Sequence, residues 1–76
     1  MRAMQSGKAP AASKILRKHL SQNPADVEAL HLLGVITYQM GKPDDAAGYI
    51  GKAVAAGTNN PSHYANWGLA LKAAGR

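Results

Sequence analysis

The sequence contains no cysteine, which excludes a disulfide framework and a thiolate metal site. This absence fits a reducing compartment, so we expect a cytoplasmic protein. Long apolar runs are missing too, because the longest, residues 29–36 and 53–56, fall far short of the ~20 residues that span a bilayer. Residues 1–8 include no apolar stretch of the kind found in a secretory signal. We therefore expect neither a membrane span nor secretion.

Acidic residues are scarce: four stand against nine basic ones, for a formal net charge of +5. Each acid follows a proline closely, at a predicted helix start, where a carboxylate complements the positive end of the helix dipole. These acids are Asp26, Glu28, Asp44 and Asp45. The basic residues of segment 14–18 fall on one predicted helix beside apolar residues, which indicates a solvated face. A basic helical nucleic-acid binder therefore stays a minor alternative.

The chain has enough apolar character to fold, since hydrophobic residues are 46% of its 76 residues and charged ones 17%. Its main organising feature is an internal repeat with a period of 34 residues. The positions that match are glycines, small residues and aliphatics, which packed helices constrain most. They include Gly7 with Gly41, Gly34 with Gly68, Ala12 with Ala46, and Leu16 with Ile50.

Local signals divide each period into two helices and predict an all-α fold. Asn23 and Pro24 offer an N-cap and a first helical residue, so a helix is expected from about residue 24 to residue 40. The same reasoning starts further helices at Pro43 and Pro61, ended by glycines, and places an earlier helix at residues 9–21. We expect one domain with three parts: 1–22, the end of a first repeat; 23–60, a complete repeat; and 61–76, the first helix of another.

The order and spacing of these residues resemble the tetratricopeptide repeat. The resemblance is carried by Leu30, Leu33, Gly34 and Tyr38, then Gly41 to Ala46, and again by Tyr64, Trp67, Gly68 and Leu71. It implies antiparallel helix pairs stacked as a right-handed α-superhelix, whose concave face, lined by the first helix of each pair, binds a peptide or a partner protein.

In its finer wording the sequence is similar to bacterial arrays resembling O-linked N-acetylglucosamine transferase. In those arrays an asparagine before the large residue and glycine bonds a peptide backbone, and Asn66 matches it, whereas Leu32 does not. This likeness implies, as an alternative, an array that recruits substrate for a larger glycosyltransferase or sulfotransferase.

Helical phase separates core positions from a candidate binding face. Gly34 and Gly68 lie mid-helix, where glycine costs ~1 kcal/mol relative to alanine, so we expect a close helix approach at both. His19 is expected in a slot between helices, where Ala53 stands one repeat later. Leu30, Leu33, Ile50 and Val54 are expected to fill the space between the paired helices.

The opposite phase gives the candidate peptide-binding residues, which are Met4, Gln5, Glu28, His31, Val35, Tyr38, Gln39, Asn66, Leu69 and Lys72. Met4, Tyr38 and Lys72 are separated by 34 residues each time and are expected to form one row across the groove. Such a row suits a segment that carries apolar residues and an acid. The alternative is that Met4 and Tyr38 simply pack against their neighbours.

No residue pattern points to catalysis, a cofactor or a metal, so we expect a protein that is not an enzyme. Glu28 and His31 can make half a metal site, but no third ligand follows at ligand spacing. His19 and His63 have no nucleophile or orienting acid nearby in the sequence. Gly48 and Gly51 fall inside a helix, so they do not form a phosphate-binding loop.

The last predicted helix carries large apolar residues without the polar outer face of a terminal repeat. These residues are Tyr64, Trp67 and Leu71. We expect either a fragment of a longer array or copies that associate through this helix.

Overall fold

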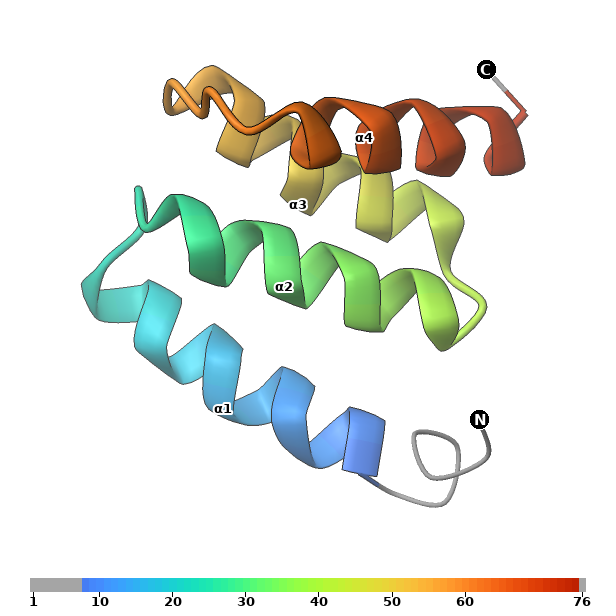
Figure 1. Cartoon of the computed structure of the whole chain (residues 1–76). Helices are drawn as coiled ribbons and strands as arrows, with labels where there is room; N and C mark the ends of the chain where they lie inside the picture. Colours follow the sequence, from blue (N-terminus) through green and yellow to red (C-terminus); the bar gives the residue numbers. More distant parts are fainter. Residues whose placement is uncertain (1–7, 76) are drawn as a thin grey trace.

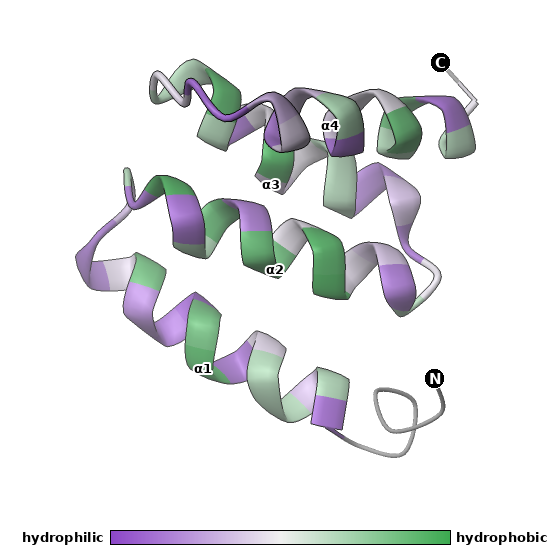
Figure 2. Cartoon of the chain, in the orientation of Figure 1, coloured by the Kyte–Doolittle hydropathy of each residue, from purple (hydrophilic) through white to green (hydrophobic). Residues whose placement is uncertain are grey.

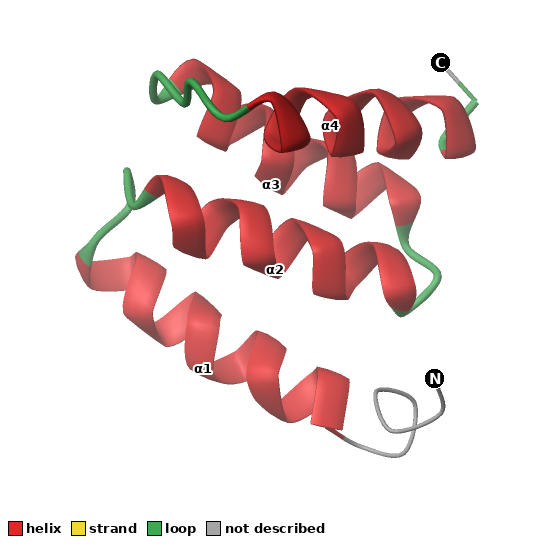
Figure 3. Ribbon diagram, viewed as in Figure 1, coloured by secondary structure: helices red, strands yellow, loops and turns green. Residues whose placement is uncertain are grey.

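The computed structural model describes residues 8–75, and every regular element among them is a helix (Figures 1 and 3). The four helices are α1 (Ala9–Gln22), α2 (Val27–Gln39), α3 (Pro43–Ala55) and α4 (Pro61–Ala73). Each packs mainly on the next one along the chain, and α2 and α4 touch only a little across α3. This confirms the predicted all-α helical repeat. None of the helices in this part of the chain combines the length and hydrophobicity that crossing a bilayer requires.

The predicted start of α2 is wrong by three residues. Pro24 and Ala25 form a turn, and Asp26 is the N-cap, since its carboxylate accepts a hydrogen bond from the Ala29 N–H at 3.1 Å. Asn23 instead ends α1, where its N–H donates to the carbonyl oxygen of His19. A carboxylate placed to satisfy an unpaired helix-start N–H decides the boundary here.

The other predicted helix boundaries agree with the structure to within two residues. Asn60 caps α4 by accepting from the Ser62 N–H at 2.9 Å, and prolines occupy the starts of α3 and α4. After α2, Gly41 takes φ +81°, and the Lys42 N–H donates to the carbonyl oxygen of Thr37. This left-handed turn closes the helix and reverses the chain, which only glycine does at little cost.

The core lies between α2, α3 and α4. Leu30, Leu33 and Ile50 are buried, as predicted, and so is Ala46, whereas Val54 is only half-buried. Hydrophobic and hydrophilic residues occur on every helix, as amphipathic packing requires (Figure 2). Trp67 is partly buried, packed against the cluster that Ile50 belongs to.

The close helix approach is confirmed at Gly34 and wrong at Gly68. A Cβ atom at Gly34 would overlap Cγ1 of Ile50 and lie 3.2 Å from the carbonyl oxygen of Ala46. A Cβ atom at Gly68 would have no neighbour within 4 Å. The difference arises because α3 packs across Gly34, whereas no described helix follows α4 to pack across Gly68.

The expectation that His19 fills an interhelical slot is also wrong. Its side chain is 45% exposed, and its Nε2 lies 2.7 Å from Oδ2 of Asp26. His19 therefore links the end of α1 to the start of α2 across the connecting turn. This bond is the main reason why the pKa of Asp26 falls below its ordinary value, and the Ala29 N–H lowers it further.

Candidate binding face

Four residues of the predicted binding face line one hollow between α2 and α4. Val35 and Tyr38 come from α2, Asn66 and Leu69 come from α4, and Ile50 of α3 lies at its floor. The hollow holds about 60 Å³, enough for a small apolar side chain rather than a large ligand. Its lining is mainly apolar, and Tyr38 and Leu69 keep 41% and 56% of their surface exposed. The structure thus offers two exposed apolar groups above a partly buried pocket.

The remaining predicted residues lie around this hollow or outside the described part of the chain. Glu28, Gln39 and Lys72 are exposed, and His31 is half-buried. Met4 and Gln5 fall outside residues 8–75, so the predicted row keeps only Tyr38 and Lys72. Ile50 was assigned to the core from its period alone, and it serves both roles because a core side chain also forms the floor of the hollow.

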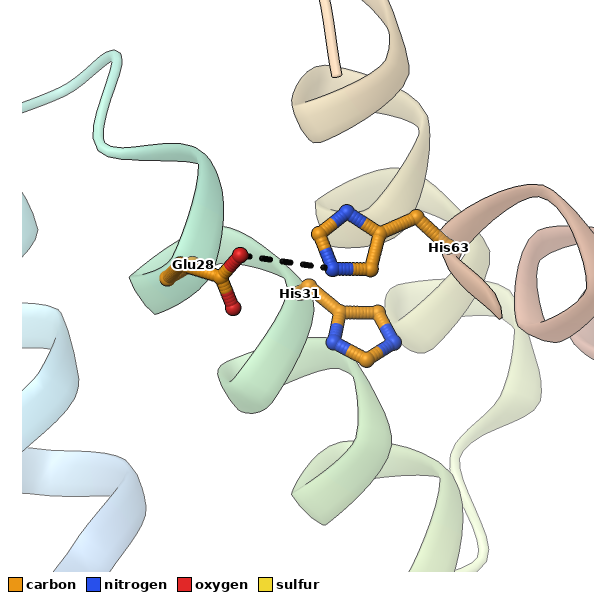
Figure 4. Close-up of side chains that lie close together, drawn as sticks. All are labelled: Glu28, His31 and His63. Atoms are coloured by element: carbon orange, nitrogen blue, oxygen red, sulfur yellow. Dashed lines mark ion pairs between the residues drawn. The ribbon is translucent and has the colours of Figure 1, made fainter. Parts of the chain in front are cut away.

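Two histidines and a glutamate meet at one end of this face, which corrects the expectation that no third group joins Glu28 and His31. The rings of His31 and His63 stack with centroids 3.9 Å apart and planes 24° apart. Oε2 of Glu28 lies 3.8 Å from Nε2 of His63 (Figure 4). His31 Nε2 is 2.8 Å from the side-chain amide nitrogen of Asn66, so this cluster adjoins the hollow.

The 34-residue period could have predicted that His63 lies near Glu28 and His31. His63 is one period of 34 residues after Ala29, which lies between Glu28 and His31 on the preceding first helix. Equivalent residues of successive first helices lie beside each other in a stacked array. The spacing of residues within one helix does not indicate that His31 and His63 are neighbours, whereas the 34-residue spacing between repeats does.

The charge state of the cluster follows from its surroundings. Burial lowers the pKa of His31 below its ordinary value, nearby His63 lowers it further, and Glu28 partly opposes both effects. A neutral His31 is therefore favoured at neutral pH, which permits the two rings to stack. His63 is 1% exposed, and its Nδ1 lies 2.7 Å from the hydroxyl of Thr58.

The comparison with known families is decisive for the fold. A family model described as the tetratricopeptide repeat matches residues 3–74. The chain belongs to the tetratricopeptide-repeat family. No curated protein and no solved structure matches it significantly.

On the repeat division predicted from the sequence, α2 and α3 would be the paired first and second helices of one repeat, and α4 would be the first helix of the next. On that prediction, the hollow between α2 and α4 would lie between two successive first helices. Membership of the family suggests a protein–protein interaction module, because tetratricopeptide repeats build extended binding surfaces and are typically not catalytic.

A different hollow, of about 260 Å³, was not predicted from the sequence. It lies between α1 and α3, with α2 beneath them. Its lining residues combine apolar and basic groups and are Arg17, Leu20, Ser21, Pro24, Leu30, Leu33, Tyr49 and Lys52. The tetratricopeptide chain therefore has a second candidate binding surface, and an experiment on the hollow between α2 and α4 must distinguish the two.

Proposed function

We propose that this tetratricopeptide chain binds a segment of a partner protein across α2 and α4. One observation carries the proposal: Val35, Tyr38, Asn66 and Leu69, which are far apart in the sequence, line a single hollow. The groups come from two first helices, so a bound segment would contact both repeats at once.

The chemistry of the face indicates the kind of segment. Tyr38 and Leu69 supply apolar surface, and a tyrosine adds a hydroxyl at little entropic cost. Lys72 is exposed one turn beyond Leu69 and supplies a cation. We therefore expect a partner segment with an apolar anchor for the hollow and an acidic residue near it.

The finer likeness to substrate-recruiting arrays of transferases has less support. In such arrays the asparagine bonds the peptide backbone, whereas the Asn66 amide nitrogen here is 2.8 Å from His31. Backbone recognition by Asn66 would require that contact to be exchanged. The proposal that copies associate through α4 also has less support, because Trp67 and Leu71 already pack against the core of the chain.

Peptide display followed by affinity measurement tests the proposal. Peptides selected on the intact chain are expected to lose about tenfold or more in affinity with Tyr38→Ala, since tenfold corresponds to about 1.4 kcal/mol and an aromatic hot-spot side chain contributes about 2 kcal/mol or more. Tyr49→Ala is the matched control, because it removes the same side chain from the hollow between α1 and α3. Circular dichroism should show unchanged helix content in both variants.

Two results would contradict this binding face. One is equal peptide affinity for Tyr38→Ala and the unmodified chain. The other is a loss of affinity with Tyr49→Ala alone, which would move the binding site to the hollow between α1 and α3.

A further inference from the structure

We propose that Glu28, His31 and His63 form a binding site for a divalent transition-metal ion of the zinc class. Such an ion would join α2, which supplies Glu28 and His31, to the first turn of α4, which supplies His63. These two helices otherwise pack mainly on α3. The inference concerns a site that the peptide-binding proposal does not need.

The donor set selects the class of metal. Two imidazole nitrogens and one carboxylate oxygen are ligands that Zn²⁺ takes in proteins, whereas Ca²⁺ and Mg²⁺ prefer oxygen ligands alone. Imidazole also suits Co²⁺, Ni²⁺ and Cu²⁺, so Zn²⁺ stands for a class of ions. With three protein ligands, a fourth position is left for water.

The distances are close to those of a metal site. One possible ligand atom from each of the three residues lies within 4.8 Å of the other two. Oε2 of Glu28 and Nε2 of His63 are 3.8 Å apart. In a tetrahedral site with bonds of about 2.1 Å, neighbouring ligand atoms are roughly 3.4 Å apart. Side-chain rotation alone can therefore bring the three donors into range.

Neighbouring side chains decide which ring nitrogens are available. The His63 Nδ1 lies 2.7 Å from Oγ1 of Thr58, so a proton on Nδ1 leaves the Nε2 lone pair directed to the Glu28 side. Figure 4 shows one ring nitrogen of His31 on the side of Glu28. The Asn66 amide nitrogen donates to the His31 Nε2, which puts the proton of the neutral ring on Nδ1, so Nδ1 becomes a ligand only once that amide turns over. Such outer hydrogen bonds orient ligating histidines.

The Asn66 amide can serve this purpose after it turns over. Its oxygen then accepts a hydrogen bond from the Nε2–H of His31, which fixes the ring form that ligates through Nδ1. Asn66 is thus a positioning residue for the proposed ion rather than a ligand.

The site combines one fixed ligand with two movable ones. His63 is 1% exposed and held by Thr58, whereas the Glu28 side chain is 79% exposed. The stacked rings must open for both nitrogens to point at one ion, and the half-buried His31 is the ring able to turn. An ion therefore has access from solvent through the Glu28 side of the cluster.

Isothermal titration of the full, untagged chain with Zn²⁺ tests the site. We expect one equivalent to bind, and we expect His31→Gln and Glu28→Gln each to weaken binding by tenfold or more. His19→Gln is the matched control, because His19 is the third histidine of the chain and sits beside the carboxylate of Asp26. Its affinity for Zn²⁺ should equal that of the unmodified chain.

Replacing the buried His63 could unfold the chain, so its role as a ligand is tested in the unmodified chain. Long-range ¹H–¹⁵N spectra of the unmodified chain should show Zn²⁺ shifting Nε2 of His63 and Nδ1 of His31, with the His19 ring unchanged. Absence of Zn²⁺ binding, equal affinity in Glu28→Gln, or a loss confined to His19→Gln would each overturn the proposed site.

Discussion

At the scale of single residues, Gly34 and Gly68 are sequence equivalents with opposite surroundings. Gly34→Ala should destabilise the chain by about 1–2 kcal/mol, because overpacking against Ile50 and the Ala46 carbonyl outweighs the better helix propensity of alanine. Gly68→Ala should instead stabilise it by roughly 0.5–1 kcal/mol, since its added methyl group meets nothing within 4 Å. Urea unfolding of both variants measures the difference. Equal stability of the two would show that α3 does not approach α2 closely at Gly34.

The same pair shows what the sequence can and cannot predict at a residue. Period and glycine position correctly predicted that a mid-helix glycine admits a neighbouring helix at Gly34. They could not distinguish Gly68, because the neighbour that makes glycine necessary belongs to another element. The same holds for His63, because its partners Glu28 and His31 lie on another helix and become its neighbours only when the helices pack.

At the scale of elements, the pairing of His19 with Asp26 makes the junction between α1 and α2 dependent on pH. Because the folded-state pKa of Asp26 is lowered, its ionised form stabilises the fold above the unfolded-state pKa near 3.8. This stability should be lost as the pH falls from there through the folded-state pKa. In His19→Ala the pKa of Asp26 should rise toward its ordinary value, as followed by carboxyl ¹³C NMR.

The control for this junction is the Asp44→Asn variant, which changes a carboxylate in the first turn of α3 and should leave the Asp26 titration unaltered. An unchanged Asp26 pKa in His19→Ala would mean that the backbone N–H groups of Ala29 and Glu28 lower it without help from His19. The junction also explains the one wrong helix start. Asn23-Pro24 and Asn60-Pro61 carry the same local signal, but only at the first does a later aspartate cap the helix instead.

At the scale of the whole molecule, each helix packs mainly on the next one along the chain, and α3 lies behind α2 and α4 in the view of Figure 1. The sequence predicted this arrangement well, because a 34-residue period and helix-ending glycines specify stacked pairs. Four of the predicted binding residues line the hollow because they share one helical phase, and their role in binding stays a prediction. The second hollow and the histidine cluster were missed, since both depend on contacts between helices that phase alone does not specify.

Helices packed in chain order should unfold first at the ends of the series, because the stability of each helix comes from its contacts with its neighbours. In α1 only Ala9 and Ser13 are buried, and Ile15 is 68% exposed, whereas α2 is buried along most of its length between α1 and α3. We therefore expect the amide hydrogens of α1 to exchange with solvent at least tenfold faster than those of α2 and α3. Native-state hydrogen exchange by NMR measures these rates helix by helix. Equal protection of α1 and α3 would show that the four helices unfold only as one cooperative unit.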